Sequence, residues 1–123
     1  MPSPDTVERF VALVETGRGL EAVETFYAEG ASVRENDSPP RRGKATLLAH
    51  EAAAQTAVSA MKARCVRPIL VDGDIVVIRW VFDYLDKRGR AVRFEELAYQ
   101  CWSGEFIAEE RFFYDPAQFS VHP

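Results

Sequence analysis

The second half of the chain alternates apolar and polar residues over four unusually long segments, and this pattern constrains the fold most. The segments cover residues 59–71, 74–86, 90–102 and 106–115, and turn residues such as Asp72-Gly73 and Ser103-Gly104 separate them. Short turns between alternating segments predict an antiparallel meander. Because strands of about a dozen residues are roughly twice the usual length, such a sheet has to curve strongly.

The first half of the chain carries helix patterns. Ser3 can cap a helix that has Pro4 at its first position, and Gly17 and Gly19 break that helix before a second amphipathic segment begins. Apolar spacing predicts helices at about residues 4–16, 20–30 and 43–57, with a short strand at 31–35 and an irregular loop at 36–40. Helices followed by a long curved sheet predict an α+β fold, and 123 residues fit a single domain, 1–123.

Composition argues against several classes of function. The formal net charge is −4 and the basic residues are scattered, which argues against nucleic-acid binding. No signal peptide or membrane-spanning segment is recognisable, so we expect a cytoplasmic protein that does not bind membranes. Cys65 and Cys101 lack metal-type spacing and are expected to be buried free thiols, with a disulfide or a nucleophile as the alternatives. His50 and His122 are far apart, so we expect no metal and no other cofactor.

Four parts of the chain together carry a family resemblance: the two opening helices, residues 26–33, Gly43-Lys44 and residues 110–116. They resemble the SnoaL-like polyketide cyclase and ketosteroid isomerase branch of the nuclear transport factor two-like superfamily. The resemblance implies a cone-shaped barrel of three helices on a long, mostly antiparallel sheet, with a small hydrophobic ligand at its open end. That fold hosts isomerases, cyclases, hydrolases, dehydratases and proteins without catalytic activity, so the fold alone does not identify the function.

The resemblance also implies positions for catalytic groups. Glu35 aligns with the general base of ketosteroid isomerases, but Phe10 and Ala98 replace the tyrosine and the protonated aspartate of their oxyanion hole. These departures argue against steroid isomerisation. Phe112 replaces the aspartate of limonene-type epoxide hydrolases, so that arrangement is not expected either. What remains is a cyclase-like role, in which a carboxylate, sometimes with a histidine, exchanges protons with an enolisable substrate.

Glu110 is the first candidate for that carboxylate. Phe112 and Tyr114 share its face of the predicted strand, and they would desolvate it and raise its pKa toward the range of a general acid or base. The alternative is a structural acid that pairs with an arginine or a tyrosine hydroxyl. Glu96 could form a carboxyl pair with Glu110, or it could be solvated at a strand end.

His50 and Glu35 are the candidate proton partners of Glu110. His50 can shuttle protons near neutral pH, or it can be a satisfied core histidine of the third helix. Glu35 faces the pocket if the first strand keeps the isomerase register, and otherwise it belongs to a solvated loop. Strand alternation and the family geometry predict the inward-facing, ligand-contacting side chains, although the aromatic ones could be ordinary core: Trp80, Phe82, Glu96, Gln100, Trp102, Phe112 and Tyr114.

The opposite face of the sheet is too apolar for bare surface. This face should carry Arg79, Glu95, Tyr99 and Arg111 beside Leu97 and Cys101. We expect two copies of the chain to pair through it as a two-fold homodimer. Three functions then compete: an enzyme without a cofactor, acting as a cyclase, isomerase or lyase on a small hydrophobic carbonyl compound; a non-catalytic binder of such a molecule; and a dimerisation module whose own side chains fill the cone.

Overall fold

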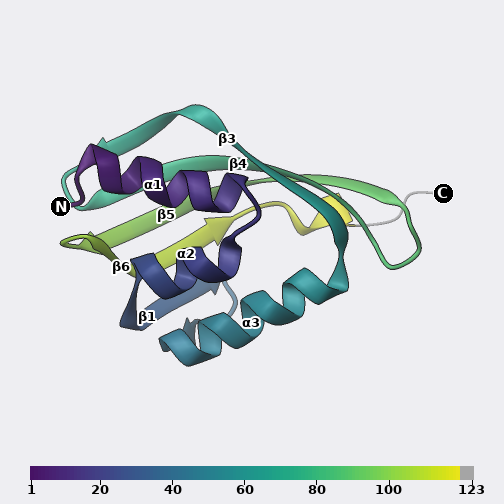
Figure 1. The fold of residues 1–123 in the computed structure, drawn as a ribbon, viewed down its shortest axis with the longest axis horizontal. Helices are drawn as coiled ribbons and strands as arrows, with labels where there is room; N and C mark the ends of the chain where they lie inside the picture. Colours follow the sequence, from purple (N-terminus) through teal and green to yellow (C-terminus); the bar gives the residue numbers. More distant parts are fainter. Residues whose placement is uncertain (120–123) are drawn as a thin grey trace.

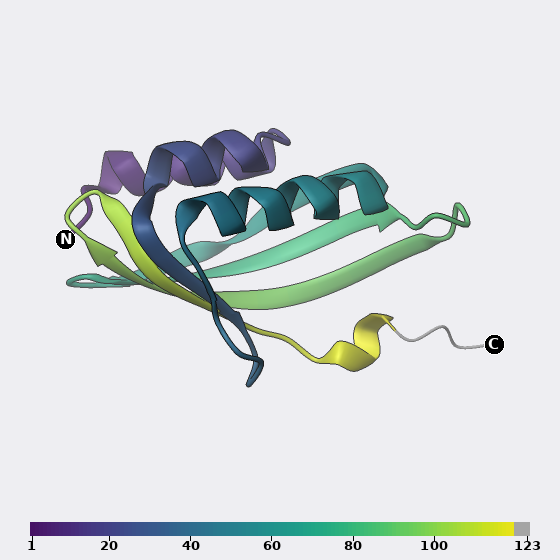
Figure 2. The ribbon, with the colours of Figure 1, turned by 90° about the horizontal axis from the view of Figure 1, so that it is seen from below.

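Three helices cover one side of a curved six-stranded sheet in the computed structural model, which describes residues 1–119 (Figures 1 and 2). This arrangement confirms the predicted α+β cone. The elements are α1 Pro4–Glu15, α2 Gly19–Phe26, β1 Tyr27–Glu35, β2 Arg41–Arg42, α3 Lys44–Ala57, β3 Ser59–Asp72, β4 Ile75–Leu85, β5 Ala91–Ser103, β6 Phe106–Phe113 and the 3₁₀ turn η1 Pro116–Phe119. His122 lies outside the described residues.

The four long strands form the predicted antiparallel meander. The order across the sheet is β2-β1-β6-β5-β4-β3. Strands β1 and β6 run parallel to each other, and the other neighbouring strands in this order are antiparallel. This pairing brings the first strand beside the last one, so that Glu35 lies opposite Phe112. The chain beyond β6 continues alongside β5, where the side-chain amide of Gln118 donates to the backbone carbonyl of Glu95 at 2.9 Å and accepts from its N–H at 2.7 Å.

The prediction for the second helix was wrong at its end. The helix ends at Phe26 rather than near Gly30, and Tyr27 already has the extended backbone of a strand, with φ −93° and ψ 138°. Tyr27 pairs with Ile107 of β6, and this sheet pairing overrides the helical spacing of the apolar residues. The register of β1 against β6 then shifts between Tyr27 and Ser32, in the stretch that contains Gly30. The two-residue strand β2 was not predicted.

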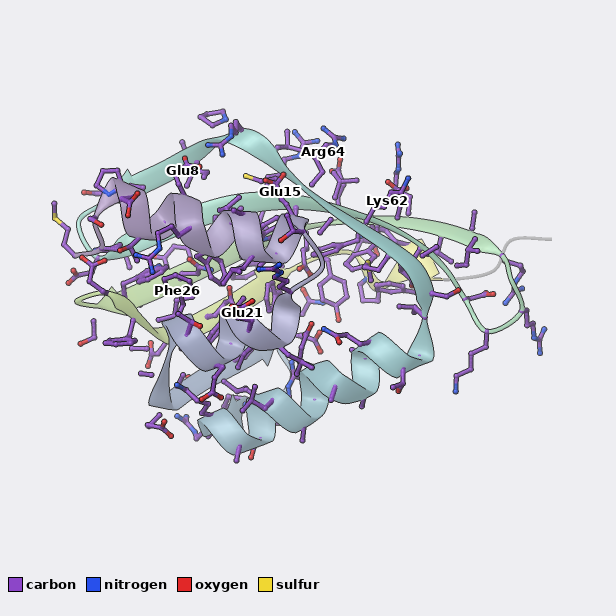
Figure 3. The ribbon with its side chains drawn as sticks, in the orientation of Figure 1. Glu8, Glu15, Glu21, Phe26, Lys62 and Arg64 are labelled. Atoms are coloured by element: carbon purple, nitrogen blue, oxygen red, sulfur yellow. The ribbon has the colours of Figure 1, made fainter. Side chains whose placement is uncertain are left out.

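Helix α1 begins as predicted and lies along the edge strand β3. The Ser3 Oγ accepts a hydrogen bond from the Thr6 N–H at 3.1 Å, and Pro4 takes the first helical position. Glu15 reaches β3 and accepts a hydrogen bond from the Cys65 N–H at 3.1 Å, and Figure 3 shows this glutamate beside β3. These contacts hold α1 above the edge of the sheet and close one end of the concave side.

The closed end of the cone is a packed aromatic core. The ring of Phe10 contacts those of Phe26, Tyr27 and Trp102, with centroid distances of 5.8 to 6.1 Å. Between Cys101 and Trp102 the β5–β6 register shifts. The irregularity lets Ile107 and Glu110, three residues apart in β6, both be buried, which strict alternation would not allow.

Alternation along the long strands divides the sheet into a concave face toward the helices and a convex face. Trp80, Gln100, Trp102 and Glu110 are buried, while Phe82 and Phe112 are half-buried and pack against the core. On the other face Arg79, Glu95 and Tyr99 are exposed, and Arg111 is half-buried. The predicted division of these side chains is therefore confirmed.

Candidate acid–base site in the cavity

A cavity of about 490 Å³ opens on the concave side, between α3 and the inner faces of the strands. Its sheet wall is aromatic, with Trp80, Phe82, Phe94 and Phe112. Helix α3 forms the opposite wall through one side of the helix, which carries Leu47, His50, Glu51 and Ala54. Only Leu47 of α3 is buried, and the short alanine side chains elsewhere on this helix do not fill the space beneath it.

Glu110 sits on the lining of this cavity and is held by two neighbours. The Tyr27 hydroxyl donates a hydrogen bond to Oε1 of Glu110, and the Gln100 Nε2 donates to Oε2 at 2.6 Å. The Trp102 Nε1 donates to the Gln100 carbonyl oxygen at 2.9 Å, which fixes the orientation of that amide. Both oxygens of a buried carboxyl group are thus fixed in place.

Burial controls the proton affinity of this group. Desolvation raises the pKa of Glu110 to about 7, although the hydrogen bonds from Tyr27 and Gln100 act in the opposite direction. Burial, followed by the nearby Glu110 carboxylate, raises the pKa of the Tyr27 phenol well above its usual value. Tyr27 therefore stays protonated as a donor, while Glu110 can gain or lose a proton near neutral pH.

Glu96 is a second carboxyl group on the lining. It lies on β5 opposite Trp80 of β4. Burial raises the pKa of Glu96 to about 8, and repulsion from the carboxylates of Glu110, Glu35 and Glu51 contributes further. Glu96 therefore carries a proton at neutral pH and can act as a hydrogen-bond donor.

Glu35, Arg41 and His50 complete the polar lining. Glu35 faces the cavity, as the isomerase register implied, and accepts a hydrogen bond from the Arg41 Nη1 at 3.3 Å. The Nε of Arg41 is buried and has no hydrogen-bond partner among residues 1–119. His50 belongs to the lining but is exposed, so it is not the satisfied core histidine that was the alternative.

Three of the predicted ligand-contacting side chains lie outside the lining. Gln100 and Trp102 are buried behind Glu110, where the aromatic core of α1 and α2 covers them. Tyr114 follows the end of β6, and its ring packs against Phe119 of η1 with centroids 5.7 Å apart. The first two support Glu110 instead of contacting a ligand. The other predicted residues do belong to the lining: Glu35, His50, Trp80, Phe82, Glu96, Glu110 and Phe112.

Among the lining residues that sequence reasoning missed are Tyr27, Arg41, Glu51 and Phe94. The sequence contained a signal for Phe94, because it shares the face of Glu96 two positions along the strand. Glu51 lies next to His50, and a helix face wide enough to include Leu47 and Ala54 accommodates both. Nothing in the sequence indicates that Tyr27 leaves the helix and turns toward Glu110.

Residues 1–119 contain no group of three or more histidine, cysteine, aspartate or glutamate side chains arranged to hold a metal ion. No helix in this range is both long and apolar enough to cross a membrane. Cys65 and Cys101 are free thiols, Cys65 buried and Cys101 half-buried.

Comparison with solved structures finds the same fold in proteins from several organisms. A Mesorhizobium loti protein named as a candidate SnoaL-like polyketide cyclase is 25% identical, with a TM-score of 0.78 over 93% of this chain and 100% of that chain. A Jannaschia protein named in the same way is 15% identical, with a TM-score of 0.81 over 100% and 99%. A nuclear transport factor two-like protein of unknown function from Burkholderia pseudomallei is 13% identical, with a TM-score of 0.80 over 93% and 91%.

The family is shown by the sequence itself. The last two structures are less than 25% identical and support the fold alone. No curated protein sequence matches this chain significantly. Residues 7–110, however, match the model of the SnoaL-like domain, and this stretch includes every strand up to Glu110 in β6. With the cavity and the cone around it, this match establishes that the chain belongs to the SnoaL-like domain family.

Proposed function

We propose that this protein binds a small hydrophobic carbonyl compound in the cavity and moves protons on it, with Glu110 as the general acid–base. One observation carries the proposal: a buried carboxyl group on the lining of an aromatic cavity, fixed at both oxygens, with a pKa of about 7. A base whose pKa lies near the working pH transfers protons most effectively. A cavity of this volume argues against a dimerisation module whose own side chains fill the cone.

The reaction begins at the carbon next to the carbonyl group. Ionised Glu110 takes a proton from this carbon, and the electron pair of the broken C–H bond moves toward the carbonyl oxygen to form an enolate. The guanidinium of Arg41, which lies on the lining, donates a hydrogen bond to that oxygen as its charge develops. Where a neighbouring carbon–carbon double bond extends the enolate to a dienolate, Glu110 returns the proton to the far carbon and the double bond shifts. Otherwise the enolate carbon attacks a second carbonyl group of the compound and closes a ring, and Glu110 gives its proton to the alkoxide that forms.

The remaining groups have supporting roles. Tyr27 and Gln100 orient Glu110 and stabilise its ionised form through their hydrogen bonds. Exposed His50 exchanges protons between the cavity and water. Glu35 accepts a hydrogen bond from the Arg41 Nη1 at 3.3 Å and holds the guanidinium at the lining. Phe10, on the lining, and buried Ala98 supply no oxyanion-hole group, so Arg41 takes that role.

The test measures exchange of the α-protons of 2-tetralone, a bicyclic ketone, for deuterium in D₂O by NMR. Glu110→Gln keeps the size of the side chain and removes the base, so the enzyme-dependent exchange rate should fall about 10²–10⁴-fold. Glu109→Gln is the matched control, since Glu109 is the exposed neighbour on the same strand. Equal rates for wild type and Glu110→Gln would contradict the proposal and leave a non-catalytic binder of the same ligand class.

A further inference from the structure

We infer that the cavity accepts a compound with a positively charged nitrogen, a protonated amine or a quaternary ammonium group, on its hydrophobic frame. This inference names the ligand class of the proposed function and rests on the same cavity. It adds a charge requirement that the acid–base proposal does not contain.

The charges on the lining are strongly one-sided. Four carboxyl groups face the cavity, those of Glu35, Glu51, Glu96 and Glu110, against the single guanidinium of Arg41. Arg41 is already engaged with Glu35 at 3.3 Å. Within residues 1–119 no ion pair reaches the other three carboxyl groups. An anionic ligand would be repelled by the carboxyl groups that ionise, whereas a cation would compensate them.

The aromatic wall beside Glu96 suits a cation. Trp80 pairs with Glu96 across the strands, and its ring lies 6.0 Å from that of Phe82, centroid to centroid. Phe82 in turn stacks on Phe94 at 4.8 Å. The faces of aromatic rings attract ammonium groups while their area buries the attached hydrocarbon. A carboxyl group next to such rings offers both parts of an ammonium site.

A second observation points to a ligand in this cavity. The guanidinium of Arg41 lies on the lining, its side chain is 24% exposed, and among residues 1–119 its only side-chain hydrogen bond goes to Glu35. Neither an ammonium group nor a hydrocarbon can accept its hydrogen bond. A ligand oxygen can do so, which indicates a compound that carries an oxygen as well as the charged nitrogen.

In the free protein, protonation of carboxyl groups lowers the negative charge on the lining. Glu96 faces Glu110 of β6, Glu35 of β1, Arg41 of β2, and both Glu51 and His50 of α3 across the cavity. Burial and the carboxylates in this set raise the pKa of Glu96 to about 8. The positive charge of a bound cation stabilises the ionised form of Glu96, so Glu96 loses its proton when the ligand binds. Binding should therefore release a proton below about pH 8 and become tighter as the pH rises toward that value.

The test compares choline with its neutral isostere 3,3-dimethylbutan-1-ol by NMR titration. Both carry a hydroxyl oxygen for Arg41 and neither titrates in the working range, so they differ in charge alone. At pH 8.5 we expect choline to bind at least tenfold more tightly, and its affinity to fall at least threefold at pH 6.5. Glu96→Gln should reduce the preference for choline at least threefold and remove the part of the pH dependence that comes from Glu96, leaving that of Glu110, whose pKa is raised to about 7. The matched control is Glu95→Gln, because Glu95 faces outward and pairs with Arg79 at 2.9 Å.

Each outcome separates the inference from the proposed function. Equal or tighter binding of the neutral isostere, or no binding of either compound, overturns the inference. If α-proton exchange on 2-tetralone still depends on Glu110 in that case, the proposed function survives without it. If choline is preferred through Glu96 but no exchange depends on Glu110, the inference holds and the catalytic proposal fails. Circular dichroism of Glu96→Gln confirms that the variant is folded.

Discussion

The concave and convex faces of the sheet use neighbouring glutamates in opposite ways. On β5, Glu95 is exposed and paired with Arg79, whereas Glu96 faces the cavity and its pKa is raised to about 8. On β6, exposed Glu109 precedes buried Glu110, whose pKa is raised to about 7. Residue type and sequence neighbourhood are nearly the same within each pair. The face of the strand therefore decides whether a glutamate is a surface charge or a proton-exchanging group.

The largest expected difference between the two environments concerns stability. Replacing Trp102 with Ala removes a buried ring of the concave core and should lower the free energy of unfolding by about 3–5 kcal/mol. Phe106→Ala changes a half-exposed ring on the other side of the same hairpin and should cost no more than about 1 kcal/mol. Urea denaturation measures both values. A similar loss for the two variants would contradict the position of the core.

The next difference is in pH dependence. The folded state holds the proton of Glu96 up to about pH 8, whereas the unfolded chain releases it near pH 4.5. The contribution of this protonation to the free energy of unfolding is therefore complete below about pH 4.5 and is lost as the pH rises toward 8. At pH 8.5, Glu96→Gln should be more stable than wild type, and at pH 4.5 nearly equal to it, because only wild type loses the stabilising proton of Glu96 over this range.

Urea midpoints between pH 4.5 and 8.5 test this prediction, with Glu95→Gln as the control that should follow wild type. Glu110→Gln should show the same sign over a narrower window, because its pKa is raised only to about 7. If the free energy of unfolding of Glu96→Gln fell with rising pH as steeply as that of wild type, the cavity would not be raising the pKa of Glu96.

The smallest effect concerns the convex face, where Leu97, Tyr99 and Phe113 are each between 42% and 47% exposed. Leu97 and Phe113 are partners across β5 and β6, so the three side chains form one convex patch. We expect two chains to pair through this patch at micromolar concentration. Leu97→Asp should weaken the dimer at least tenfold, about 1.4 kcal/mol, in analytical ultracentrifugation.

Leu20→Asp provides the control for this experiment, since Leu20 is exposed on helix α2 and lies outside the convex patch. It should leave the sedimentation coefficient unchanged. A wild-type protein that sediments as a monomer at micromolar concentration would exclude the dimer, and the patch would then be ordinary surface.

Local patterns were sufficient to predict most of the fold. The alternation along β4 placed Trp80 and Phe82 inside and Arg79 outside, because burial of one face fixes the strand register. Turn residues at Asp72-Gly73 and Ser103-Gly104 located two of the hairpins. The same alternation correctly turned Glu96 and Glu110 inward, and so the two main acids of the candidate site could be found from sequence.

The rest depended on long-range pairing that no local pattern contains. Tyr27 reaches Glu110 only because β1 begins early and pairs in parallel with β6. Arg41 meets Glu35 because a two-residue strand, β2, turns back along β1. Gln100 and Trp102 were correctly placed on the inner face, but the depth at which α1 and α2 cover that face decides that they support Glu110 instead of touching a ligand.

The positions of the two tryptophans give the molecule an optical consequence. Trp80 is part of the cavity wall, while Trp102 is buried behind Glu110 and its indole N–H is bonded to Gln100. A molecule that enters the cavity therefore changes the surroundings of one fluorophore and leaves the other as an internal reference. In a Trp102→Phe protein the whole indole emission would come from the wall of the cavity, and its quenching would report occupancy without any added label.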